Sequence, residues 1–577
     1  MTKTISSLNV SCISTWGDVL KKFLLTTVFG LSTFALATSA FAQAEIEQVD
    51  ERFEQRRPPL SEPGRILPAF DPLDAPLAAE AITLRLGGVR IIGNTVVGEE
   101  ELGQFYEMLL DTEVPVTAIF ALANRITAYY GQQGYPLSRA IVPAQEIGSD
   151  GIINIQIVEG FVDRVEIDDE RARENAILRE HGETLTRERP ISNARLEREL
   201  LLADDLPGMQ VRSVLRRSDE TQGATTVVLD TEEQRPVALS FTLDNRGSDA
   251  IGPFQMELSA SFNNVLHLNS QTRLRFANAS LNRELLFGEL EHEAVLNAQG
   301  LRLLFGLRGS RAEPGTAAFQ AIDLQSESFT GYAELRYPAI RSRNQNLYVY
   351  GRIEARDSET TALNTLLSRD RIRSLRLGAD YDRVDDFGGL NTALLEISMG
   401  IPGLGANSNN DPLNSRADGR VDYFSGTLDL SRTQQLGYFS DDLAAWSVFG
   451  QFRGQFTGTS LLSSEECSLG GSELGRAFDP STLAGDRCIA ALVEARYQVQ
   501  NSGFLDSLQL YAFADAGSVS DVGGGGSSQL SSAGLGARFG LAGNYRGSIE
   551  VNQQLRNTDG GVDTGSPRVF LSISGEF

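Results

Sequence analysis

The chain is 577 residues long, which exceeds one ordinary domain and predicts at least two. It carries 76 acidic residues against 51 basic ones, a formal charge of −25, which excludes binding of nucleic acid through general electrostatic attraction. Lysine occurs only at positions 3, 21 and 22, so every basic side chain beyond them, histidine apart, is an arginine.

The first 42 residues have the pattern of a secretory signal peptide. Lys21 and Lys22 precede an apolar run from Phe23 to Ala42, and the run closes in the small-x-small form of a cleavage site. A membrane anchor is the alternative, but threonine and serine within the run count against it. We expect the mature chain to begin near Gln43 in an exported compartment.

A charged segment and a proline-rich segment come next. Residues 43–57 predict a short helix with Ile46, Val49 and Phe53 on one side. Residues 58–81 contain prolines at short intervals and read as an extended linker. A disordered leader is the alternative for both.

Two compact α+β units follow, at 82–160 and 161–235. Each predicts the order strand, helix, helix, strand, strand, which is an internal repeat of architecture rather than of residues. The predicted elements of the first unit are 84–92, 99–110, 117–130, 140–143 and 152–158. Those of the second are 162–167, 175–185, 193–203, 211–215 and 224–229.

From residue 236 to Phe577 the chain is predicted to be all β. Apolar and polar residues alternate in segments of roughly 10 residues, as in Val237 to Leu243, and the last segment ends at Phe577. Strands with one apolar face and one polar face are typical of a transmembrane β-barrel. The length allows about 16 antiparallel strands. A soluble sandwich or propeller is the alternative.

A glycine-rich loop within this region carries Arg476 and Phe478, and Asp515 lies in a later alternating run. An arginine on a long loop and an aspartate on a nearby strand suit a charge-assisted clamp that would hold the loop inside the barrel. A surface loop with a solvated arginine is the alternative. Cys467 and Cys488 flank the loop and are candidates for one disulfide, with two free thiols as the alternative.

This arrangement resembles the two-partner secretion outer-membrane translocators, the haemolysin and filamentous haemagglutinin exporter family of ShlB/FhaC/HecB type. Arg476, Phe478 and Asp515 match that family's loop and strand motifs, while Ala477 stands where glycine is usual. The two α+β units resemble POTRA domains. Their family-like stretches are Gly131 to Tyr135, Val158 to Gly160 and Asp205 to Gly208.

The resemblance implies an outer-membrane translocator of a Gram-negative cell with periplasmic POTRA domains. These would capture an unfolded exoprotein, and open sheet edges suit such capture because they template an extended peptide. The implied partners are a large adhesin or cytolysin of β-helical fold, outer-membrane lipid and the barrel assembly machinery. Residues 43–57 would plug the pore, and Phe577 would be the barrel-insertion signal. Alternatives are a barrel insertase or a passive porin.

Chemistry-bearing motifs are few. No nucleophile elbow or nucleotide fingerprint occurs, and we expect no catalysis and no cofactor. His181, His267 and His292 are the only histidines, and no two of them lie at a metal-binding spacing along the sequence, so no metal is predicted.

Overall fold

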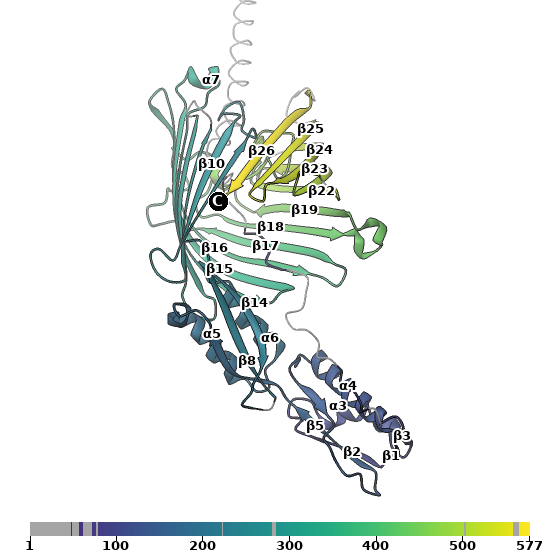
Figure 1. Ribbon diagram of the computed structural model, residues 1–577. Coiled ribbons are helices and arrows are strands. Elements are labelled where there is room, and N and C mark those ends of the chain that lie inside the picture. The colour runs from purple at the N-terminus through teal and green to yellow at the C-terminus, as the bar shows by residue number, and fades with distance from the viewer. Residues whose placement is uncertain are drawn as a thin grey trace, which may run out of the picture.

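The computed structural model describes Gln48, Phe53 and residues 57–61, 72–76, 79–221, 223–279, 284–500, 503–524, 526–557 and 565–577. Two α+β units lead into a β-barrel, and the second unit lies directly against the barrel (Figure 1). Within these ranges no helix is long and apolar enough to cross a membrane. The predicted signal peptide, residues 1–42, lies outside the described residues.

The barrel is a closed antiparallel sheet of sixteen strands among the described residues. Each barrel strand pairs with the barrel strand that follows it along the chain. The last strand closes on the first through Ser572↔Asp244 to Glu576↔Ser240. The predicted number of strands is confirmed. The strands are β9(Val237–Asp244), β10(Gln255–Asn263), β11(Ser270–Ala279), β12(Leu285–Val295), β13(Arg302–Ala312), β14(Gln325–Arg341), β15(Gln345–Ala362), β16(Thr365–Val384), β17(Gly389–Gly400), β18(Phe424–Gln435), β19(Trp446–Thr457), β22(Arg487–Gln498), β23(Ser507–Ser520), β24(Ser527–Leu541), β25(Tyr545–Asn557) and β26(Arg568–Glu576).

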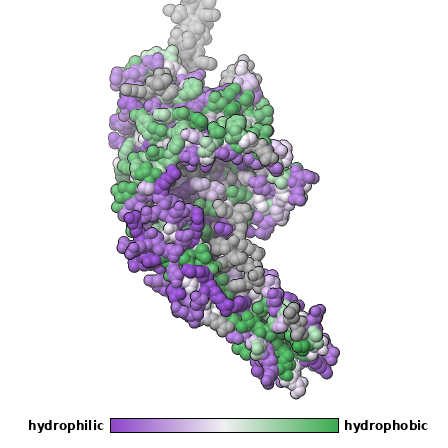
Figure 2. Space-filling model, viewed as in Figure 1, coloured by the Kyte–Doolittle hydropathy of each residue, from purple (hydrophilic) through white to green (hydrophobic). Residues whose placement is uncertain are grey.

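The alternating sequence gives the barrel an apolar outside and a polar inside. In β26, Val569, Leu571 and Ile573 are exposed on the outer face, whereas the alternating Ser572 and Ser574 are partly buried on the inner face. Apolar residues gather over the outer strands, and polar residues predominate over the second α+β unit below (Figure 2). An apolar outer band on a closed barrel is what lipid requires, because closure leaves no backbone edge to be solvated.

The first α+β unit has a sheet in which β2(Gly88–Ile92) and β5(Ile152–Val158) run parallel, with β4(Arg139–Ile141) antiparallel beside β5. Helices α3(Glu99–Gly103) and α4(Val116–Gln132) lie against it, and Leu102, Leu122 and Ile126 are fully buried. A short ladder joins β1(Thr83–Arg85) to β3(Glu113–Pro115).

Two predicted elements of this unit are wrong in detail. The strand over 84–92 is interrupted at Gly87, where a Cβ atom would come within 1.9 Å of the Asp150 carbonyl oxygen. This close approach of two backbones ends β1 and lets β2 begin in a different sheet. The helix over 99–110 stops at Gly103 and resumes as the 3-10 turn η1(Glu107–Leu109), so that Phe105 packs on Tyr129 with ring centroids 5.2 Å apart.

The second unit repeats the pairing of the first. β6(Phe161–Ile167) runs parallel to β8(Ala224–Glu233), and β7(Met209–Arg217) is antiparallel beside β8. Asn175 caps α5(Ala176–Arg187) by accepting two backbone N–H groups, and Ser192 caps α6(Asn193–Asp204) in the same way with one. Val295 of the barrel completes this unit's core, which ties the unit to the barrel.

Charged contacts fix the second unit beneath the barrel. The guanidinium of Arg341 at the end of β14 donates to both carboxylate oxygens of Asp205, at 2.7 and 2.8 Å. Arg302 donates to the Asp205 carbonyl at 3.1 Å, and the Arg343 backbone donates to Glu197 at 2.7 Å. The stretch Asp205 to Gly208, noted for its family resemblance, therefore forms the joint between the two domains.

Candidate functional site: a loop inside the barrel

The segment between β19 and β22 turns back into the barrel instead of leaving it. It forms a hairpin of β20(Cys467–Leu469) and β21(Leu483–Gly485), whose tip carries residues 474–478. Leu474, Ala477 and Phe478 are at most 3% exposed and pack with the inner-face residues Leu492 and Phe513. The loop is therefore docked on the wall formed by β22 to β26.

Arg476 and Asp515 are brought together, but not by the side-chain clamp expected from the sequence. The backbone N–H of Arg476 donates to Asp515 Oδ2 at 3.0 Å. The guanidinium donates instead to Glu494 Oε2 at 2.6 Å and stacks 4.6 Å above the Phe513 ring. Asp515 thus binds the main chain of the loop, and Glu494 binds the guanidinium of Arg476.

Glu494 on β22 bonds arginines of two barrel strands in addition to Arg476 of the loop. Arg538 of β24 donates to both of its carboxylate oxygens at 2.7 and 2.9 Å, and Arg496 donates at 2.6 Å. Its side chain is fully buried, so these partners replace the water that a buried carboxylate needs. In the sequence, the only sign of Glu494 is that it falls on the inward-facing positions of an alternating strand. Many other acidic residues of the barrel fall on such positions, so the sequence does not distinguish Glu494 from them.

The loop tip is fastened through its backbone as well. Asn552 donates to the Arg476 carbonyl at 2.9 Å, and Gln554 donates to the Ala477 carbonyl at 3.0 Å. Ser532 donates to Asp515 Oδ1 at 2.5 Å and completes the acceptor site. The turn's positive φ falls at Gly475, at +78°, so Ala477 fits where glycine is usual in the resembled family.

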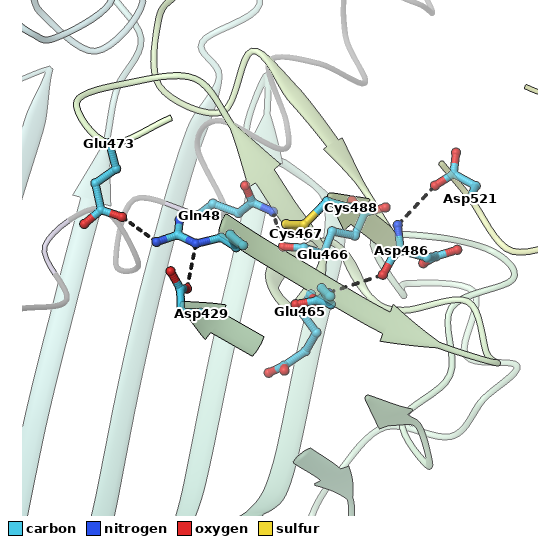
Figure 3. Close-up of a disulfide and its surroundings, with 11 residues drawn as sticks. Gln48, Asp429, Glu465, Glu466, Cys467, Glu473, Asp486, Cys488 and Asp521 are labelled. Carbon is cyan, nitrogen blue, oxygen red and sulfur yellow. Dashed lines mark hydrogen bonds and ion pairs between the residues drawn. A yellow bond between two sulfur atoms is a disulfide. The ribbon is translucent and has the colours of Figure 1, made fainter. Parts of the chain in front are cut away.

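The base of the loop is joined to the barrel by a disulfide between Cys467 of β20 and Cys488 of β22, with their Cα atoms 6.0 Å apart (Figure 3). Glu466, Asp486 and Asp521 lie beside it with carboxylate oxygens within 4.8 Å of one another. The guanidinium of Arg416 bonds to all three, so this acidic group already has its cation.

Described residues of the N-terminal segment contact the same interior. Gln48 donates to the carbonyls of Ser463 and Glu466 at 2.9 and 3.1 Å, at the base of the loop. Phe53 stacks on Phe287 with centroids 4.6 Å apart, and Arg57 pairs with Glu293 at 2.6 Å. The rest of the predicted plug helix, 43–57, lies outside the described residues.

Below the loop the lumen is a cavity of ≈1730 Å³. It extends from Asp205 and Leu206 at the joint to Glu465 and Glu473 of the loop. Arginine, glutamate and serine are the residues that occur most often in its wall, so the interior is polar and charged.

Phe577 lies at the closure of the barrel. Its backbone N–H donates to the Leu239 carbonyl at 2.8 Å, and its own carbonyl accepts from the Leu239 N–H at 3.0 Å. The ring lies 6.3 Å from that of Phe241. Its role as an insertion signal stays a prediction.

Comparison with known families gives two matches. Residues 223–539 match the family model described as haemolysin secretion/activation protein ShlB/FhaC/HecB, which is more than half of the chain. Residues 84–160 match the POTRA domain of ShlB type.

Individual relatives agree with these matches. The outer membrane transporter CdiB of Dickeya dadantii strain 3937 is 23% identical over 82% of this chain and 83% of its own length. The heme/hemopexin transporter protein HuxB of Haemophilus influenzae strain 86-028NP is 23% identical over 92% and 95%. The solved structure of CdiB from Escherichia coli superposes with a TM-score of 0.70 over 90% of this chain and 94% of that one, at 18% identity.

Proposed function

The chain belongs to the haemolysin secretion/activation protein family ShlB/FhaC/HecB, and from this membership we propose how it moves its cargo. It is an outer-membrane transporter of the two-partner secretion type, with its POTRA region in the periplasm. The cargo is a large exoprotein, an adhesin or cytolysin of β-helical fold, which reaches the periplasm unfolded.

Capture takes place on the two α+β units. Each has a three-stranded sheet whose outer strands pair on one side only among the described residues, β2 and β4 in the first and β6 and β7 in the second. An outer strand binds an extended peptide through backbone hydrogen bonds, with little dependence on its sequence. The joint at Asp205 and Arg341 directs the captured segment toward the barrel opening, where the cavity begins.

Passage requires the lumen to be cleared. Gln48 donates to the carbonyls of Ser463 and Glu466 at the base of the loop, so the displacement of either the loop or Gln48 loosens the other. The outer membrane offers no nucleotide, and folding of the exoprotein beyond the pore biases the movement outward. Arg476 and Asp515 return the loop to its docked position after transport.

The observation that carries this proposal is the loop held at Arg476 inside a closed barrel that is joined to the two α+β units. Its test is co-expression with a candidate exoprotein, a large secreted chain of β-helical fold, in a Gram-negative host without other exporters of this type. The exoprotein is expected at the cell surface or in the medium only when both are present.

Two further measurements distinguish this function from a barrel insertase and from a passive porin. A barrel insertase would restore outer-membrane barrels when the host's own insertase is depleted, with no effect on the exoprotein. A passive porin would give large, steady conductance in lipid bilayers, whereas a filled lumen gives small and intermittent conductance. Either result in place of exoprotein export would overturn the proposal.

A further inference from the structure

Two histidines that are distant in sequence meet on the outer surface at the periplasmic end of the barrel. His267 lies in the turn between β10 and β11, and His292 lies near the end of β12. The Nε2 atoms are 3.4 Å apart. The antiparallel register, which places His292 opposite Thr272, brings them together across 25 positions of sequence.

The spacing fits two ligands of one tetrahedral ion. Imidazole nitrogens bound to zinc at the usual distance lie about 3.3 Å apart along one edge of the tetrahedron, and the ring centroids behind them lie about 5.2 Å apart. The centroids of His267 and His292 are 5.3 Å apart, with the ring planes at 79°. Both separations therefore place the ring nitrogens around a common point.

The other nitrogen of each ring has the partner that a metal ligand needs. His267 Nδ1 lies 2.8 Å from the Leu268 carbonyl oxygen, and because a carbonyl only accepts, Nδ1 carries the proton and Nε2 presents a lone pair. His292 Nδ1 lies 2.9 Å from Thr272 Oγ1, which can accept in the same way. Such oxygen partners fix the tautomer of metal-bound histidine.

We propose that His267 and His292 form a binding site for a divalent transition-metal ion, with Zn²⁺ as the ion that their tetrahedral spacing fits. His267 is exposed, so water can complete the coordination. The ion ties the β10–β11 turn to β12 beside the joint, since Asn264 of that turn donates to the Pro207 carbonyl at 3.0 Å. The sequence prediction of no metal rested on spacing along the chain, which does not register a pair formed across a hairpin.

The test uses the full chain in detergent, purified through a histidine-free tag, stripped with a chelator and titrated with zinc sulfate alone. One zinc ion is expected to bind per chain at micromolar concentration, with nitrogen ligands in its X-ray absorption spectrum. His267→Ala and His292→Ala each weaken binding about tenfold or more. Val265→Ala, in the same exposed turn, leaves binding unchanged. Heat-dependent gel mobility shows that each variant retains a folded barrel.

Thr272 is a positioning residue, and its variants separate metal binding from a simple N–H···N hydrogen bond between the rings. Thr272→Val weakens zinc binding about tenfold because His292 loses its oriented partner, while Thr272→Ser restores it. Absence of saturable binding to the wild-type chain overturns the proposal. So does a His267→Ala/His292→Ala double variant that binds zinc as tightly as the wild-type chain.

Discussion

Arg476 meets Asp515 through its main chain, with a separation of 3.0 Å between the arginine nitrogen and the carboxylate oxygen, while its guanidinium is bonded elsewhere. The pairing of an arginine and an aspartate in sequence motifs invites the assumption of a salt bridge. Here the aspartate acts as a buried acceptor for a backbone amide and for the Ser532 hydroxyl.

Asp515→Asn therefore keeps most of the loop's docking. An asparagine oxygen can accept the Arg476 N–H, and its amide can donate to Ser532 after the hydroxyl rotates. Asp515→Ala removes both acceptors and costs the docked loop about 2 kcal/mol. Protease cleavage within residues 470–480 measures docking, and we expect it in Asp515→Ala and not in Asp515→Asn. Equal cleavage of both variants would show that the charge of Asp515 is what matters.

Glu494→Gln produces a larger effect than any change at Asp515. Its carboxylate bonds Arg476, Arg496 and Arg538 in a fully buried position. Breaking such a buried pair costs about 3 to 5 kcal/mol because the remaining charges stay desolvated. The variant should release the loop and also unfold at lower temperature on heat-modifiability gels. Glu576→Gln, at an exposed site near the carboxy terminus, is the control and should change neither property.

Reduction of Cys467–Cys488 loosens the base of the loop but leaves its tip docked. The bond closes a segment with a sequence separation of 21, for which the loss of chain entropy is worth about 3 kcal/mol. Cys467→Ser/Cys488→Ser should increase cleavage near residues 458–466 and leave the barrel folded. Maleimide labelling should find no free thiol in the mature wild-type chain before reduction and two after it. Labelling without reduction would contradict the assignment.

Asp205→Ala uncouples the second α+β unit from the barrel. Arg341 is left buried without the carboxylate that it grips at 2.7 and 2.8 Å, a loss of about 3 kcal/mol. Hydrogen exchange should accelerate in α6 and in the turn at 296–301, with the β-barrel strands unchanged. Asp219→Ala, on an exposed turn of the same unit, is the matched control. Unchanged exchange in α6 would show that the apolar contacts around Val295 suffice.

The sequence predicts the strands of the barrel wall better than it predicts the contacts inside the barrel. Alternation of apolar and polar residues predicts a barrel of β-strands, because lipid lies outside and water inside, and the length of the region predicts about 16 of them. The partner of Arg476 is not predictable in the same way. Glu494, Asp515 and Glu550 all face the lumen at similar registers, and only the folded loop decides among them.

Close contacts between segments distant in sequence were also not predictable from the sequence. Gly87 ends a strand because another backbone lies against it, and His292 meets His267 because of hairpin register. Neither contact leaves a local mark in composition or periodicity. The sequence marked Asp205 to Gly208 only as a family-like stretch, and its place at the joint with Arg341, 136 positions away, came only from the fold.

The central claim is that export depends on the loop held inside the barrel, and Arg476→Ala tests it most directly. The measurement is the amount of co-expressed exoprotein outside the cell, compared with the wild-type chain and with Arg546→Ala, an exposed arginine on β25. We expect the Arg476→Ala barrel to reach the outer membrane in normal amount and to export little or none. Normal export by that variant would contradict the account.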